Sequence, residues 1–240
     1  MAKKKKSLVK IIIVFVIYLV AAVLAIYLIT NYLNRPRFVR YPAFGIPVPV
    51  NYSIHGIDVS HHQAVINWAD VKDMKDKDIK IGFAFIKATE GLSNVDNAYR
   101  RNWFKAKEAK LPRGAYHFFI SSKSGKAQAE NFIETVTLEK GDMPPVLDIE
   151  QTNGASAEDL QQRVKDWLTA VEKQFKVKPI IYTNVDFYKN FLAGRFDDYP
   201  LWVAHYLVKD KPRIDRNWLF WQHNETGRVD RKSTRLNSSH

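Results

Sequence analysis

The sequence predicts an α/β domain with a parallel sheet, closest to a barrel with an abbreviated last part, behind one N-terminal transmembrane helix. Short β-rich runs alternate with segments whose apolar residues recur every three or four positions, which is typical of strands and helices alternating along a parallel sheet. A charge-free apolar run at residues 11–29 precedes this alternation. The 240 residues fit one medium-sized domain plus an anchor better than two full domains.

Residues 11–33 form the predicted transmembrane helix. The run 11–29 contains no charge, glycine or proline. At ~1.5 Å per residue it approaches the ~30 Å thickness of the hydrocarbon core, and residues 30–33 extend it. The alternative is a cleaved signal peptide, but its apolar region would be only about 7–15 residues long and would end in a small-x-small site. An uncleaved anchor is therefore favoured.

The charges around this helix predict a single-pass cell-membrane protein. Residues 1–10 contain five lysines and are expected to stay cytoplasmic, which places the remaining chain on the outer side of the membrane. Residues 34–53 hold four prolines and no helical period, so we expect an extended tether there. The globular domain is then expected over residues 54–229.

Seven β-rich runs and three helix-like segments make up this domain. The longest helix-like segment, 157–175, would begin at the N-cap Ser156 and place apolar side chains on one face. Little room remains for a full helix between the last two runs, so five βα units followed by bare strands predict the abbreviated barrel. The runs are 54–59, 81–87, 114–119, 145–149, 179–182, 201–205 and 218–222, the other helix-like segments are 97–110 and 126–138, and the shared face holds Leu160, Val164, Trp167, Leu168 and Val171.

Composition excludes several classes of protein. The chain has no cysteine, so neither a disulfide framework nor a thiolate metal site is available. A hydrophobic fraction of 46% is ample for a packed core. The net charge of +12 resembles that of a nucleic-acid-binding protein, but eight of the basic residues lie among the first ten and the last ten positions. The rest is only mildly basic, and we predict no nucleic-acid partner.

The segment PPVLDIE at residues 144–150 carries the most informative chemistry. Asp148 and Glu150, two positions apart on a strand, would point to the same face about 6.5–7 Å apart. The carboxyl ends of parallel barrel strands form the active-site mouth. Two close carboxylates there suit glycoside cleavage, with one protonated as the acid and the other ionised to stabilise positive charge on the sugar. Taken by itself, the D-x-E spacing is explained equally well by a cap for the following helix or by a solvated pair of carboxylates.

A third acid and a set of aromatic residues join this pair. Asp58 ends the first run in HGIDVSHH, where it is alternatively a turn residue, and we interpret His61 and His62 as surface residues. No spaced third ligand accompanies the two histidines, so we predict neither a metal nor a cofactor. Aromatic rings at strand ends can stack on sugar rings, although each is equally well explained as barrel core. They are Tyr116, Phe118, Tyr182, Trp202, Tyr206 and Trp221.

Seven segments in order resemble one known family. HGIDVSHHQAVINW, FAFIKATEG, GAYHFF, PVLDIE, IIYTN, LWVAHY and FWQH span about residues 54–229 and together resemble glycoside hydrolase family 25, the Chalaropsis-type lysozymes. The resemblance implies a TIM-like (β/α)5(β)3 barrel that cleaves the β-1,4 bond between N-acetylmuramic acid and N-acetylglucosamine in peptidoglycan. By motif position, Glu150 matches the general acid, Asp148 the carboxylate beside it, and Asp58 the acid of the first strand.

The same resemblance extends to the substrate and the mechanism. Lys87, Glu90 and Gln222 lie in two of these segments, and we add them to the candidate substrate-binding residues. The resemblance implies retention of configuration, with the substrate's acetamido group as the nucleophile, while a covalent glycosyl-enzyme is the alternative route. A non-catalytic, membrane-tethered peptidoglycan-binding module is the alternative function, and the presence of all three acids argues against it.

The end of the sequence departs from the family pattern. The family usually closes its barrel with a strand bearing a V-D-x-N-x-F type motif. Here the chain reaches Asp230, which is too close to Trp221 to be that acid, and continues as RKSTRLNSSH. We interpret residues 230–240 as a non-native tail resembling translated cloning adapter. The last strand is therefore expected to be missing, which would leave an open barrel edge.

Overall fold

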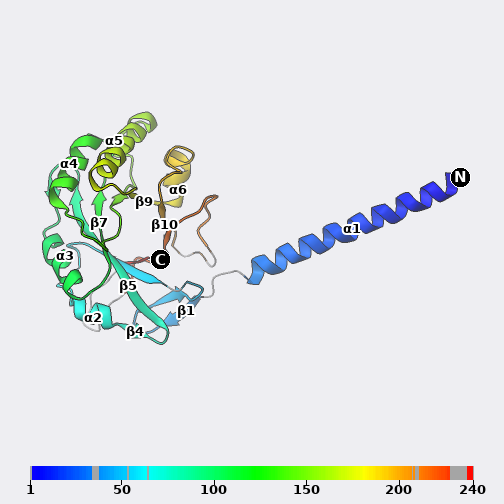
Figure 1. Ribbon diagram of the computed structural model, residues 1–240, viewed down its shortest axis with the longest axis horizontal. Coiled ribbons are helices and arrows are strands. Elements are labelled where there is room, and N and C mark those ends of the chain that lie inside the picture. Colours follow the sequence, from blue (N-terminus) through cyan, green and yellow to red (C-terminus); the bar gives the residue numbers. More distant parts are fainter. Residues whose placement is uncertain are drawn as a thin grey trace. The chain divides into compact units, whose positions relative to one another are not determined.

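The computed structural model describes residues 2–33, 38–52, 54–63, 65–206, 208, 211–227 and 237–239. The chain forms two units, of which the first contains helix α1 (Ala2–Leu33) and the second is the domain that starts at strand β1 (Figure 1). Within α1, the 24 residues Lys10–Leu33 are long and apolar enough to cross a membrane, judged by length and composition. The helix includes the basic segment, because nothing in residues 2–10 breaks it.

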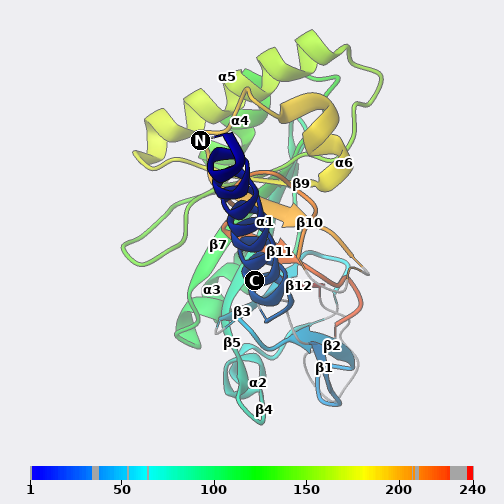
Figure 2. The ribbon, with the colours of Figure 1, turned by 90° about the vertical axis from the view of Figure 1, so that its right-hand side faces the viewer.

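The domain is built on a curled parallel sheet. Its seven parallel strands follow one another in space in the order of the chain, and the larger helices cover the outer face (Figures 1 and 2). Each predicted run forms one of these strands. They are β3 (His55–Val59), β5 (Ile79–Glu90), β7 (Arg113–Phe118), β8 (Val146–Asp148), β9 (Ile180–Asn184), β10 (Leu201–Ala204) and β11 (Phe220–Gln222).

Five helical connections join the first six of these strands, as predicted. The last connection, from β10 to β11, contains no helix in its described residues. Two of the helices lie where the sequence analysis proposed none, and short strands β4 (Lys75–Asp76) and β6 (Asn94–Val95) pair antiparallel with β5. The connections are α2 (Trp68–Asp73), α3 (Tyr99–Glu108), α4 (Gly125–Thr135), α5 (Ala157–Phe175), and α6 (Val185–Phe187) with the π-helical turn η1 (Tyr188–Leu192).

Helix α5 shows how local sequence sets an element. The Ser156 side chain accepts a hydrogen bond from the backbone N–H of Asp159 at 3.1 Å, which satisfies one of the free donors at the helix start. The helix ends where Lys176 adopts a left-handed conformation with φ of 58°. All five apolar residues predicted to share one face are fully buried, so the prediction for this helix is confirmed.

Two apolar layers lie on the two faces of the sheet. The inner layer lies inside the curled sheet and is mainly aromatic; it comprises Phe83, Phe85, Val146, Ile180, Tyr182, Trp202 and Ala204. Two glycines make room for it. A Cβ on Gly56 would lie 2.2 Å from the Phe83 ring, and one on Gly114 would lie 2.5 Å from the Phe85 ring. The outer layer packs the strands against the helices. The inner layer forms a floor below the carboxyl ends of the strands.

The predicted tether is wrong for residues 38–49. Strands β1 (Phe38–Tyr41) and β2 (Ile46–Pro49) form an antiparallel hairpin whose turn contains Gly45 with φ of 72°. Tyr41, Phe44, Ile46 and Val48 are buried in the outer apolar layer. The prolines were misleading because a two-stranded ribbon has free edges, where a missing backbone N–H is tolerated. The domain therefore begins near residue 38, and residues 34–37 lie outside the described part.

The expected open edge beside β3 is also wrong. Strand β12 (Asn237–Ser239) pairs antiparallel with β3, with Ser238 opposite Ile57. It lies beside β11 as well, although no ladder joins β11 and β12 among the described residues (Figure 2). An edge strand with unpaired N–H and C=O groups accepts any extended segment. Pairing therefore does not show whether residues 230–240 are native, and that interpretation stays a prediction.

Candidate active site

A pocket of about 450 Å³ opens at the carboxyl ends of the parallel strands. Near the ends of the strands, the side chains at every second position point into the pocket, because neighbouring residues on a strand face opposite sides of the sheet. Ten of the twelve candidate residues lie together around this pocket. They are Asp58, Lys87, Tyr116, Phe118, Asp148, Glu150, Tyr182, Trp202, Tyr206 and Gln222.

The two carboxyls of the D-x-E segment share one wall of the pocket. Asp148 is the last residue of β8, and Glu150 lies two positions further along the chain. Between them, Ile149 is fully buried on the other face. Backbone hydrogen bonds from Phe119 N to Asp148 O at 2.8 Å and from Ile149 N to Tyr182 O at 2.9 Å hold this segment between its neighbours. The backbone therefore fixes both carboxyls toward the pocket.

Burial makes this pair hold protons unusually strongly. Asp148 is 8% exposed, and its Oδ1 has no hydrogen-bond partner among the described residues. Burial raises the pKa of Asp148 well above its usual range, and the neighbouring Glu150 raises it further, while Lys87 lowers it. Burial also raises the pKa of Glu150, while its hydrogen bond with Asp148 lowers it and the charge of Glu225 raises it. Two adjacent carboxyls, one buried and one half-buried, do not readily both ionise, so we expect the pair to retain one proton to higher pH than separate acids would.

Asp58 is held by a relay of hydrogen bonds from the opposite wall. Gln222 Oε1 accepts hydrogen bonds from the hydroxyls of Tyr182, at 2.6 Å, and of Tyr206. Burial raises the pKa of both phenols, so they stay protonated and donate. Because its oxygen is occupied, Gln222 must present Nε2 to Asp58 Oδ2, at 2.9 Å. The relay also links β11 to β3, which no strand ladder joins within the described residues.

Two candidate residues do not line the pocket. Trp221 is fully buried and packs against the rings of Phe38 and Trp218, with ring centroids 5.8 and 6.3 Å away. It lies on the opposite face of β11 because it directly precedes Gln222. Its prediction as a sugar-stacking residue is therefore wrong. Glu90 instead binds Lys87, with Oε2 2.6 Å from the lysine Nζ.

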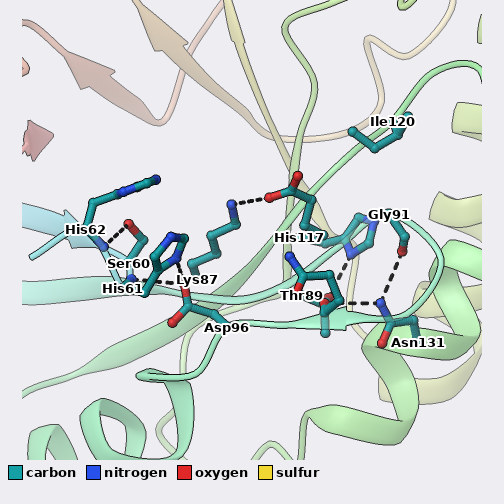
Figure 3. A network of polar contacts seen from close by, with 12 residues as sticks. Ser60, His61, His62, Lys87, Thr89, Gly91, Asp96, His117, Ile120 and Asn131 are labelled. Atoms are coloured by element: carbon teal, nitrogen blue, oxygen red, sulfur yellow. Dashed lines mark hydrogen bonds and ion pairs between the residues drawn. The ribbon is translucent and has the colours of Figure 1, made fainter.

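The sequence analysis missed four residues at the pocket. Glu225 follows β11, and Ser60, His62 and Gln63 follow β3. His62 is exposed, as predicted for a surface residue, and it also lines the pocket from the loop that follows β3 (Figure 3). The loop is anchored by His61, whose backbone N and ring Nδ1 lie 2.9 and 2.7 Å from Asp96 Oδ2. The position of the segment just after a barrel strand was the available signal, since such loops surround the mouth. Within the described ranges, no three potential ligands cluster to hold a metal.

Comparison with known sequences gives one family and several relatives. A family model described as "Glycosyl hydrolases family 25" matches residues 57–231. "Uncharacterized protein YegX" of Escherichia coli (strain K12) is 46% identical over 202 residues, which is 84% of this chain and 74% of that protein. "Lysozyme M1" of Streptomyces globisporus is 35% identical over 192 residues, which is 73% of this chain and 63% of that protein.

Solved structures share the same fold. A family 25 glycosyl hydrolase from Bacillus anthracis has a TM-score of 0.72 at 30% identity, and the match covers 79% of this chain and 88% of that chain. A bacterial lysozyme from Streptomyces coelicolor has a TM-score of 0.69 at 32% identity, with coverage of 79% and 92%. Both likenesses extend over most of the domain that contains the pocket.

Proposed function

Since the chain belongs to glycosyl hydrolases family 25 and is a glycosidase, we propose that it cleaves the β-1,4 bond between N-acetylmuramic acid and N-acetylglucosamine in peptidoglycan. The observation that carries the proposal is the pair of neighbouring carboxyls at the mouth of the pocket, the buried Asp148 and the half-buried Glu150, whose pKa values are both raised by burial. Relatives named as lysozymes support the choice of substrate.

In the proposed reaction Glu150 is the general acid. It gives its proton to the glycosidic oxygen as the bond to the anomeric carbon breaks, so the leaving sugar departs as a neutral alcohol. The acetamido oxygen of the substrate attacks the anomeric carbon, and the ionised Asp148 stabilises the positive charge that develops on this group. Glu150 then takes a proton from water, which opens the intermediate with net retention of configuration. Tyr116, Phe118 and Trp202 supply aromatic walls for the sugar rings.

A bell-shaped dependence of activity on pH is the expected signature of this shared proton. At low pH both carboxyls are protonated and the stabilising charge is lost, whereas at high pH both are ionised and the acid is lost. Because burial raises both pKa values, the alkaline limb should lie above the ordinary glutamic acid value of 4.5. The full chain in detergent, added to a suspension of purified walls, gives the profile as loss of turbidity. A rate that keeps rising after the pair has ionised would contradict a shared-proton mechanism.

We also propose that α1 is an uncleaved anchor that crosses the cell membrane once. Its apolar part, Lys10–Leu33, has the required length, and the five lysines of residues 1–10 favour the cytoplasmic side. The domain would then face peptidoglycan on the outer side, tethered to the membrane. Residues 34–37, between the helix and the domain in the sequence, lie outside the described part.

Protease accessibility tests this orientation. Protease added outside intact spheroplasts is expected to degrade the domain while an epitope placed before residue 10 stays protected, because the bilayer shields only the cytoplasmic side. A cytoplasmic marker protein must remain intact as the control. Protection of the domain would reverse the topology, and a shorter form released into the medium would show that the helix is cleaved.

A further inference from the structure

The pocket wall combines four carboxyls with one lysine. Asp58, Asp148, Glu150 and Glu225 all line the pocket, and Lys87 is the one lysine or arginine among its described lining residues. Lys87 is only 8% exposed, although a lysine is rarely so buried unless its charge is paired. A buried cation among acids that share a proton affects where that proton lies.

Strand register places the Lys87 ammonium at the level of Asp148. Lys87 lies opposite Tyr116, whereas Glu90 lies opposite Phe118, and Phe118 lies opposite Asp148. The lysine backbone is therefore about two residues, or ~7 Å, below Asp148, which an extended lysine side chain spans. Its Nζ does reach that level, since it lies 2.6 Å from Glu90 Oε2 and 5.0 Å from the centroid of the Phe118 ring.

Two contacts hold the ammonium in place without neutralising its effect on the pocket. The Glu90 side chain is 34% exposed, so solvent screens its charge, and it occupies one of the three ammonium donors. The Phe118 ring attracts the cation through its face. Figure 3 shows the Lys87 side chain extended from its strand, with the hydrogen bond of its ammonium to Glu90 drawn as a dashed line. The Lys87 charge also lowers the pKa of Asp148, in opposition to burial.

We propose that Lys87 is a positioning residue that keeps the negative charge of the acid pair on Asp148 and thereby leaves the shared proton on Glu150. Burial alone favours the proton on Asp148 and the negative charge on Glu150, because Asp148 is the more deeply buried of the two. Lys87 touches no reacting atom in this role, which rests on the proposed function. The other titratable groups that line the pocket with the pair are Asp58, His62, Tyr116, Tyr182, Tyr206 and Glu225, and Glu90 contacts Lys87 from outside this lining.

Titration of Asp148 tests the proposal without any activity measurement. In the full chain carrying Glu150→Gln, Asp148 is the remaining acid of the pair, and its ¹³C-carboxyl signal is identified by its loss in Asp148→Asn. Lys87→Gln keeps a donor for Glu90 but removes the charge, and should move the titration midpoint of Asp148 up by about one pH unit. Lys87→Arg should restore most of the shift.

A matched control exists on the outer surface of the domain. Lys105 of α3 forms the same kind of pair, with Nζ 2.7 Å from Glu108 Oε2 and 5.7 Å from the centroid of the Phe104 ring, but both partners are exposed. Lys105→Gln should leave the Asp148 midpoint unchanged. If Lys87→Gln also leaves the titration midpoint of Asp148 unchanged, the proposal is overturned. Lys87→Arg shows whether the site tolerates replacement of the lysine.

The dependence of activity on pH provides the second arm. With Glu150 present, Lys87→Gln should move the acid limb of kcat/KM to higher pH and lower kcat more than it changes KM, while Lys87→Arg should restore the limb. A purely structural role would lower the rate without moving the limb, and that result also overturns the proposal. If the parent does not cleave peptidoglycan, the proposed function fails, whereas the Asp148 midpoint still decides the role of Lys87.

Discussion

Replacing Glu150 with glutamine is expected to lower the rate of peptidoglycan cleavage by at least ~10²-fold, the scale of losing a positioned general acid. The amide has nearly the same shape but no proton to give to the glycosidic oxygen. Binding should change little, because the aromatic walls of the pocket remain. The loss should therefore appear in kcat and not in KM, measured on purified walls at the pH optimum of the parent.

A surface substitution of the same chemistry serves as the control. Glu130 is exposed on helix α4, so Glu130→Gln should keep the parental rate and melting temperature. Both variants should melt within a few degrees of the parent, which separates lost chemistry from lost folding. Parental activity in Glu150→Gln would remove this residue from the role of acid.

Replacing Asp148 with asparagine is expected to lower the rate by ~10²–10³-fold, because it removes a charge that stabilises the positive intermediate. The acid limb of the pH profile should disappear as well, since the group that must be ionised is absent. Activity near the parental level would show that the charge of Asp148 is not needed.

The same variant should be at least as stable as the parent. When the pKa of an acid is higher in the folded than in the unfolded protein, the protein becomes less stable as the pH rises above the pKa of that acid in the unfolded protein. Burial raises the pKa of Asp148 in this way, and its Oδ1 has no partner among the described residues. Asparagine removes the buried charge, so melting at neutral pH should be unchanged or higher. A clearly lower melting temperature would mean that Asp148 supports the fold.

The acid pair was predictable because it depends on short-range geometry. A two-residue spacing at the end of a buried strand fixes both side chains on one face, and the parallel barrel fixes which end is the mouth. The same rule exposes the error at Trp221. Gln222 was also a candidate, and two adjacent residues of a strand cannot both face the pocket. The two-residue periodicity of β11 was therefore a usable signal against counting every aromatic residue at a strand end as a sugar-stacking residue.

The residues that the sequence analysis missed, and its error over the hairpin, depend on contacts between distant parts of the chain. His62 faces the pocket in a loop whose anchor, the pairing of His61 with Asp96, joins residues 35 positions apart. Glu225 follows the last parallel strand in a segment without a hydrophobic period. The hairpin at residues 38–49 is stabilised by burial against the domain, which its prolines concealed. Local pattern does not specify such contacts.

The identity of the sugar at newly formed chain ends tests the central claim most directly. Purified peptidoglycan is digested with the full chain in detergent, the fragments are reduced with borohydride, and the reduced sugars are identified by mass spectrometry. Cleavage by the Asp148–Glu150 site as a muramidase predicts N-acetylmuramitol at the new ends, formed by the parent and not by Glu150→Gln. New ends that carry N-acetylglucosaminitol, or fragments formed equally by both proteins, would contradict it.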